Sequence, residues 1–138
     1  MAFVVLALAA CGNHAPRSPE AVARAWSSDL NRNDNRAAGA LFARDATIVQ
    51  TGAMLLHSRA DAVQWNALLP CGGTITSVKA NGRNQVLVIF TLTERPRHRC
   101  DAPGSSAATI FRVRNGKIVL WHQTYVPSAP APAAGQTV

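Results

Sequence analysis

The chain has 138 residues, of which 48% are hydrophobic, so it is long enough to bury the core of one domain but not of several. Fourteen Lys and Arg residues against seven Asp and Glu residues give a net charge of +7. The basic residues are scattered along the chain, and the only local cluster is Arg95-Pro96-Arg97-His98-Arg99. This distribution argues against a nucleic-acid partner and favours solubility and attraction to anionic lipid headgroups.

The chain begins with an uncharged apolar segment, residues 2–10, which ends at Cys11-Gly12. This segment is too short to cross a bilayer as a helix, which needs about 20 residues, but it suits the apolar region of a secretory signal peptide. The small residues before the cysteine resemble the lipobox of bacterial lipoproteins. In that class the signal peptide is cut before the cysteine, and the cysteine thiol then carries diacylglycerol.

The resemblance implies that residues 1–10 are a signal peptide, that Cys11 is lipidated, and that residues 11–18 are a short polar tether. We therefore expect an exported protein of the cell envelope that is held at a membrane by its lipid anchor. The alternative is an apolar N-terminal helix with an unrelated cysteine.

The next part of the chain has the pattern of three helices. Ser18 is a candidate N-cap for a helix that carries Trp26 and Leu30 on one face. Residues 31–34 (Asn-Arg-Asn-Asp) end this pattern and cap a second helix, whose apolar stripe ends at Phe42. Short strands are predicted at 46–50 and 55–56, and a third helix at 58–69.

The second half of the chain is predicted to be β-structure. Residues rich in Val, Ile, Thr and Phe form candidate strands at 74–80, 83–94, 107–114 and 117–126. Asn81-Gly82 and Asn115-Gly116 are strong hairpin-turn signals. The Pro/Ala-rich tail, residues 127–138, is predicted to be disordered. Three helices followed by long hairpins predict an α+β fold with a strongly curved antiparallel sheet.

The cysteines other than Cys11 form an even pair, Cys71 and Cys100. A hairpin about Asn81-Gly82 places residue 71 opposite about residue 92, and the loop beyond that strand returns Cys100 to the same end of the sheet. An exported protein retains disulfides, so we expect a bridge between these two cysteines. Neither cysteine lies in a Cys-x-x-Cys motif or a metal-like cluster, and the sequence predicts no metal site and no cofactor.

Three segments carry a resemblance to the nuclear transport factor 2-like superfamily, which includes SnoaL-like cyclases and ketosteroid isomerase. They are residues 26–34, 41–49 and 111–121, and the similarity extends over residues 19–126, which we expect to form the domain. The resemblance implies a cystatin-like cone, in which the three helices pack on the concave face of the curved sheet around a deep pocket. Many unrelated functions use this cone, so the fold alone does not assign one.

The residues that carry ketosteroid isomerase chemistry are replaced in this chain. The tyrosine that stabilises the oxyanion falls on Trp26, the general-base aspartate on Gln50, and the protonated aspartic acid near Thr109. Because general acid–base catalysis needs a titratable group beside the substrate, we expect no isomerase activity and assign no catalytic residue.

The predicted pocket is apolar and aromatic, with a few neutral polar groups. It comprises Trp26, Leu30, Gln50, Trp65, Thr109, Phe111, Trp121, Gln123 and Tyr125. Such a lining favours a non-enzymatic domain that binds a small apolar ligand or a protein partner. The alternative is that the aromatic residues fill the cone as core.

Two other functional hypotheses remain open from the sequence. The first is a SnoaL-like cyclase, hydrolase or isomerase that uses Asp29 or His57 as its acid–base residue. The second is an interaction module that forms a homodimer through the outer face of its sheet. Asp45, Asp61 and Asp101 are interpreted as structural, and His122 is expected to point away from the pocket.

Overall fold

The computed structural model describes residues 15–128, and it confirms the predicted α+β architecture. The elements are α1 (Pro19–Asn31), α2 (Asn35–Ala40), β1 (Phe42–Val49), β2 (Ala53–Leu56), α3 (Arg59–Leu68), β3 (Gly72–Ala80), β4 (Gln85–Thr93), β5 (Ser106–Arg114) and β6 (Lys117–Thr124). The predicted signal peptide, Cys11, part of the tether and most of the 127–138 tail lie outside the described residues.

The helices begin at side-chain caps, as the sequence indicates. Ser18 Oγ accepts a hydrogen bond from the Ala21 N–H at 3.1 Å, and Asp34 Oδ1 accepts one from the Ala37 N–H at 3.0 Å. The second helix is shorter than predicted, because it ends at Ala40 and Phe42 belongs to β1. Phe42 pairs with Ile118 of β6 and packs against Trp65, and both partners are distant in sequence.

The six strands form one sheet in the order β2-β1-β6-β5-β4-β3. Neighbouring strands are antiparallel except for the parallel pair β1 and β6. The two-residue turn Asn115-Gly116 joins β5 to β6 with positive φ angles of 49° and 73°, the conformation that tight hairpins require. The Asn81-Gly82 turn lies in a longer loop, residues 81–84.

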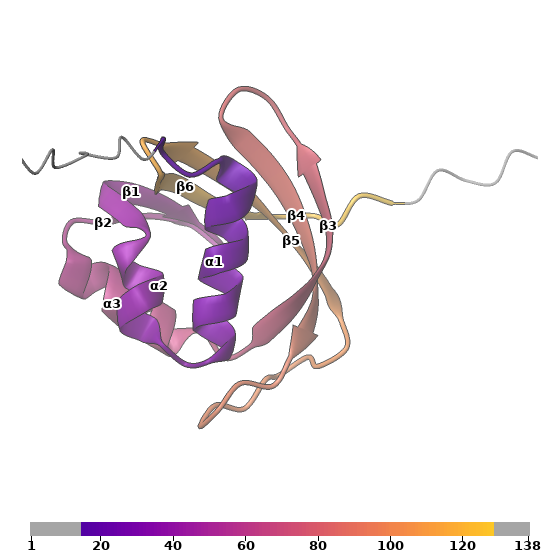
Figure 1. Cartoon of the computed structure of the whole chain (residues 1–138). Helices are drawn as coiled ribbons and strands as arrows, with labels where there is room; N and C mark the ends of the chain where they lie inside the picture. Colours follow the sequence, from indigo (N-terminus) through magenta and orange to yellow (C-terminus); the bar gives the residue numbers. More distant parts are fainter. Residues whose placement is uncertain (1–14, 129–138) are drawn as a thin grey trace, which may run out of the picture.

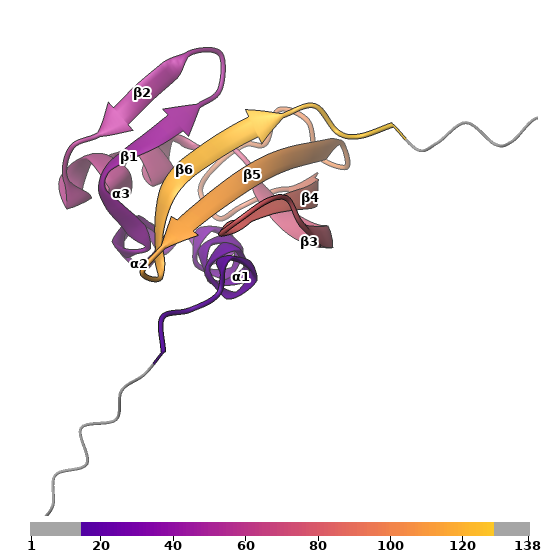
Figure 2. The same ribbon diagram turned by 90° about the horizontal axis from the view of Figure 1, so that it is seen from above.

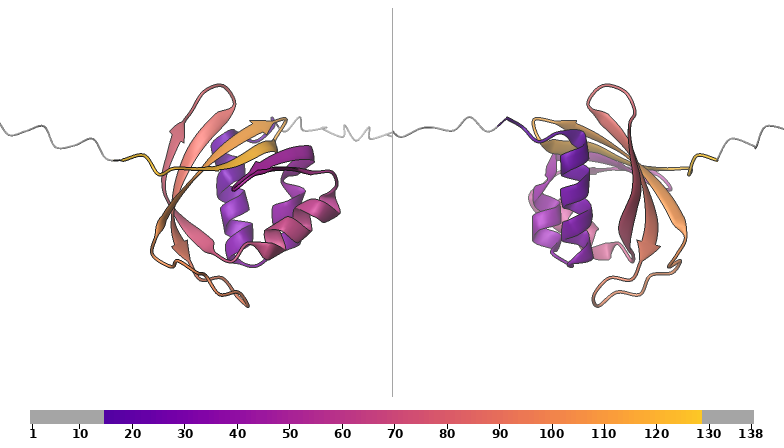
Figure 3. Two further views of the ribbon diagram at one scale, coloured as in Figure 1. Left: turned by 180° about the vertical axis from the view of Figure 1, so that it is seen from behind. Right: turned by 45° about the vertical axis from the view of Figure 1, so that its right-hand side comes forward.

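The three helices lie on one side of the sheet, which curls around α1 to form a cone (Figures 1 and 2). The view from behind in Figure 3 shows the long, bent β3–β4–β5 part of the sheet standing away from α2 and α3. Within residues 15–128, no helix is long and apolar enough to span a membrane.

An aromatic cluster fills the narrow part of the cone. The ring of Trp26 lies 5.4 Å from Phe111, 5.9 Å from Trp121 and 6.2 Å from Phe90, measured between ring centroids. Trp65 extends the cluster to Phe42, with a centroid separation of 5.6 Å. Each such pair stabilises the fold by about 1 kcal/mol beyond the burial of its area. The aromatic residues therefore form much of the core.

Two features join the loop after β4 to the rest of the domain. The predicted disulfide between Cys71 and Cys100 is confirmed, with a Cα–Cα distance of 4.5 Å. Arg95, which the sequence places in a basic cluster, has only 3% of its surface exposed. The cluster is therefore not a continuous basic surface, because its first arginine is part of the interior.

Candidate functional site

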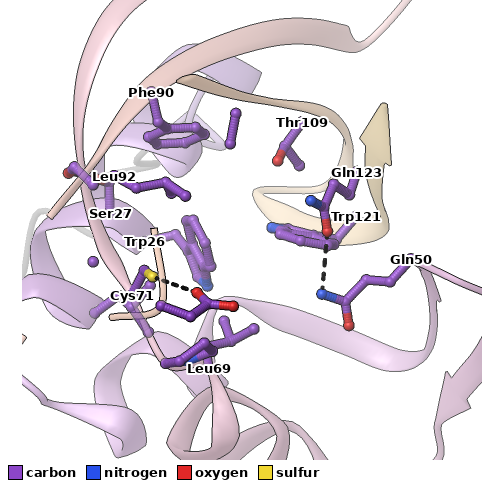
Figure 4. A pocket seen from close by; sticks show the side chains of 16 residues that line it. Trp26, Ser27, Gln50, Leu69, Cys71, Phe90, Leu92, Thr109, Trp121 and Gln123 are labelled. Carbon is purple, nitrogen blue, oxygen red and sulfur yellow. Dashed lines mark hydrogen bonds between the residues drawn. The ribbon is translucent and has the colours of Figure 1, made fainter. Parts of the chain in front are cut away.

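A cavity of about 270 Å³ opens at the end of the cone beside the disulfide. It lies between α1 and the concave side of strands β3 to β6, and Gln50 closes it from the end of β1. Figure 4 shows the buried rings of Trp26, Phe90 and Trp121 at its inner end. The rim is exposed and polar, with Gln50 and Gln123 on one side and Asp101 on its wall.

Polar contacts hold α1 against the first residues of β3, and this contact forms one wall of the cavity. The Asn31 amide donates to the Gly73 carbonyl at 2.8 Å and accepts from the Gly73 N–H at 2.9 Å. Ser27 Oγ donates to the same carbonyl at 3.1 Å. Gly72 allows this close approach, because a Cβ atom there would collide with Asn31 Oδ1.

Six of the nine predicted pocket residues line this cavity: Trp26, Leu30, Gln50, Thr109, Trp121 and Gln123. The pairing of β5 with β6 explains why three of these residues lie together on one face of the sheet. Thr109 of β5 lies opposite Gln123 of β6, and alternation along β6 places Trp121 on the same face.

The structure places the other three predicted residues elsewhere. Phe111 is fully buried behind Trp26, and Trp65 packs between Phe42 and Trp121, so both belong to the core. Tyr125 is 95% exposed and does not line this cavity. Because β6 ends at Thr124, the alternation that orients Gln123 does not extend to Tyr125.

The positions that correspond to the isomerase machinery have other roles here. The Trp26 indole N–H donates to Asn66 Oδ1 at 2.8 Å, so this donor is used inside the core. Gln50 Nε2 donates to Gln123 Oε1 over a long 3.4 Å at the rim (Figure 4). Thr109 is buried in the cavity wall. None of these three side chains is an acid or base at neutral pH.

Neither acid–base candidate named from the sequence lines the cavity. Asp29 forms an ion pair with Arg32 at 2.6 Å along α1. His57 contacts Asp45 at 3.1 Å with 69% of its side chain exposed. His122 does not line the cavity either.

Sequence reasoning missed two important residues of the lining, Phe90 and Asp101. Phe90 was detectable, because Val86, Val88 and Phe90 alternate along β4 and are all buried. Asp101 lies in a loop, where no periodicity reports orientation.

Asp101, Cys71 and Cys100 form a cluster of metal-ligating atoms within 4.8 Å. The bridge leaves neither sulfur as a thiolate, which is the form that binds metal.

The curved six-stranded sheet, the helices on one side of it and the pocket at its open end define a nuclear transport factor 2-like, cystatin-like cone. The SnoaL-like domain family matches residues 23–121, and the chain therefore belongs to this family. No functionally curated protein matches the sequence significantly.

Solved structures with low sequence identity share the fold. One is an NTF2-like protein of unknown function from Cytophaga hutchinsonii, with a TM-score of 0.63, 14% identity and coverage of 80% of this chain and 91% of that chain. Another is a candidate polyketide cyclase from Sinorhizobium meliloti, with a TM-score of 0.62, 15% identity and coverage of 75% and 94%. A candidate ketosteroid isomerase from Kribbella flavida has a TM-score of 0.58, 23% identity and coverage of 84% and 82%.

Proposed function

We propose that this SnoaL-like domain binds a small, largely apolar molecule in its cavity and is held at a membrane of the cell envelope by a lipid on Cys11. The observation that carries the binding proposal is the cavity itself, with a buried aromatic inner end and a polar rim. Clefts of this kind bury most of a small ligand's surface and orient it with a few polar groups.

Trp121, a residue of the cavity lining, has a buried donor whose partner is not in the described part of the chain. The indole Nε1 of Trp121 is buried and has no hydrogen-bond partner among residues 15–128. Buried donors in native proteins are nearly always paired, with protein, water or ligand. The lining offers no acid–base group at the isomerase positions, and its one carboxylate, Asp101, is exposed at the rim, which supports binding over isomerase chemistry.

The binding proposal predicts that a small neutral arene enters the cavity. Benzyl alcohol is expected to bind with a dissociation constant of about 1 mM, the scale for a ligand of so few atoms. The chain has three tryptophans, so a ¹H–¹⁵N spectrum resolves their indole signals. We expect saturable shifts at Trp26 and Trp121, which line the cavity, and smaller shifts at Trp65, which does not.

Two variants locate this binding. Ala107→Phe places a ring in the cavity from β5 and is expected to weaken binding at least tenfold. Ser106→Phe adds the same ring at the adjacent exposed position and is expected to leave the affinity unchanged. No saturable shift in the wild-type protein, or equal affinity in both variants, contradicts the binding proposal.

The anchoring proposal predicts that Cys11→Ser abolishes membrane attachment in bacterial cells that express the full chain. The wild-type protein is expected in the membrane fraction with the mass of a cleaved, acylated chain, because several acyl chains anchor stably where one does not. Cys71 and Cys100 are bridged and do not compete for this modification. Recovery of the wild type as a soluble, uncleaved chain with an unmodified Cys11 contradicts the proposal.

A further inference from the structure

The cavity is chemically divided between its inner end and its rim. Trp26, Phe90 and Trp121 at the inner end are almost fully buried, whereas the amides of Gln50 and Gln123 at the rim are exposed. Asp101 is also exposed and is the one carboxylate in the lining, which holds no Lys, Arg or His. The chain has twice as many basic as acidic residues, yet the only charged side chain in the cavity lining is acidic.

The carboxylate of Asp101 has no counter-ion in the described part of the chain. The acidic side chains of residues 15–128 that contact a basic side chain are Glu20 and Asp29, each paired with an arginine, and Asp45, which contacts His57. Asp101 Oδ1 lies 3.4 Å from Cys71 Sγ, the contact drawn in Figure 4. A disulfide sulfur carries no hydrogen and no positive charge, so this contact leaves the carboxylate available to a ligand.

The backbone beside Asp101 is well anchored. Cys100 is buried and covalently joined to Cys71, which itself lines the cavity. The Cys100 N–H donates to Glu94 Oε2 at 2.9 Å, so the neighbouring carboxylate is already engaged. Asp101 is therefore held at the cavity by the disulfide of its neighbour Cys100 and not by a salt bridge of its own.

We propose that the ligand of this cavity is a small amphipathic cation, with an apolar body at the aromatic inner end and an ammonium group at the rim facing Asp101. This inference rests on the proposed function and names the ligand class. An ammonium group donates charge-assisted hydrogen bonds to a carboxylate, and amide oxygens of the rim glutamines accept its other protons. A carboxylate ligand, by contrast, is repelled by Asp101.

The test compares three ligands of nearly equal size and different charge: benzylamine, benzyl alcohol and benzoate. At neutral pH, the full chain is expected to bind benzylamine about fivefold more tightly than benzyl alcohol, the scale of one charged contact at a partly exposed site. Benzoate is expected to bind most weakly. Without Asp101, the net charge of +7 would produce the opposite order, with benzoate above benzylamine.

Asp101→Asn keeps the size of the side chain and removes its charge, and it is expected to reduce benzylamine affinity to that of benzyl alcohol or below it. Asp45→Asn is the matched control, because it removes the same charge from an exposed aspartate that does not line the cavity. The control is expected to retain the preference for the amine.

Equal binding of the amine and the alcohol by the wild type overturns this inference. So does tightest binding of benzoate, or an amine preference that survives Asp101→Asn. In each of these cases binding in the cavity still stands, since a ligand is bound. If none of the three compounds binds, the proposed function fails, and the inference that rests on it fails too.

Discussion

Arg95→Met is expected to lower the free energy of unfolding by about 4 kcal/mol, because it leaves one buried and three partly buried acceptors unpaired. Arg95 Nη1 donates to the carbonyls of Asn66 and Leu69 at 2.8 and 2.7 Å, at the C-terminal end of α3. Its Nη2 donates to the side-chain oxygens of Asn33 and Asn35 at 2.6 and 2.7 Å, at the junction of α1 and α2. One side chain thus joins three helices, and urea unfolding followed by circular dichroism measures its loss.

Two further substitutions separate this role from the charge of Arg95. Arg99→Met removes an exposed guanidinium from the same loop and is expected to change stability by less than about 0.5 kcal/mol. Arg95→Lys keeps the positive charge, but one ammonium cannot reach four acceptors in two directions. We expect Arg95→Lys to lose more than half of the stability that Arg95→Met loses. Wild-type stability in Arg95→Lys would contradict this account.

Burial lowers the pKa of Arg95 from its ordinary value. A base whose pKa is lower in the folded than in the unfolded state opposes folding wherever it is protonated, because the folded state must bury its charge. The four hydrogen bonds must offset this cost. Since a guanidinium stays protonated at ordinary pH, the effect of Arg95→Met is expected to be constant from about pH 5 to about pH 9.

The sequence predicted local features well and distant partners poorly. Caps such as Ser18 and Asp34 and the turn at Asn115-Gly116 depend on neighbouring residues, and all three are in the structure. Phe42 has the spacing of a helical residue, but its pairing with distant Ile118 places it in a strand. Arg95 lies in a polar, basic stretch, and its burial depends on acceptors more than two dozen residues away.

The same distinction applies to the candidate site. Alternation along the last strand predicts one face for Trp121 and Gln123, and both line the cavity, whereas Tyr125 lies beyond the end of β6. Whether an aromatic residue lines a cavity or closes the core depends on packing, as the contrast between Trp121 and Phe111 shows. Asp101 belongs to a loop whose position is set by a covalent bridge, and no local sequence pattern predicts that this side chain lies at the cavity.

Removing the disulfide by the double substitution Cys71→Ala and Cys100→Ala is expected to lower the free energy of unfolding by about 3.5 kcal/mol. The two cysteines are 29 residues apart, and the estimate follows from the loop entropy that the bridge removes from the unfolded chain. The closed loop contains β3, β4 and Arg95, so the bridge and the arginine constrain the same segment. Urea unfolding of the wild type and the double variant measures the difference.

A reducing agent provides the matched control for the disulfide. It is expected to destabilise the wild type by about the same 3.5 kcal/mol and to leave the double variant unchanged, because only the wild type has a bridge to lose. The bridge acts partly on the unfolded state, so the double variant is expected to keep the contacts of the folded state. The indole signal of Trp26, whose N–H is bonded to Asn66, is therefore expected to stay unchanged. Equal stability of the double variant and the oxidised wild type would contradict the assigned role of the bridge.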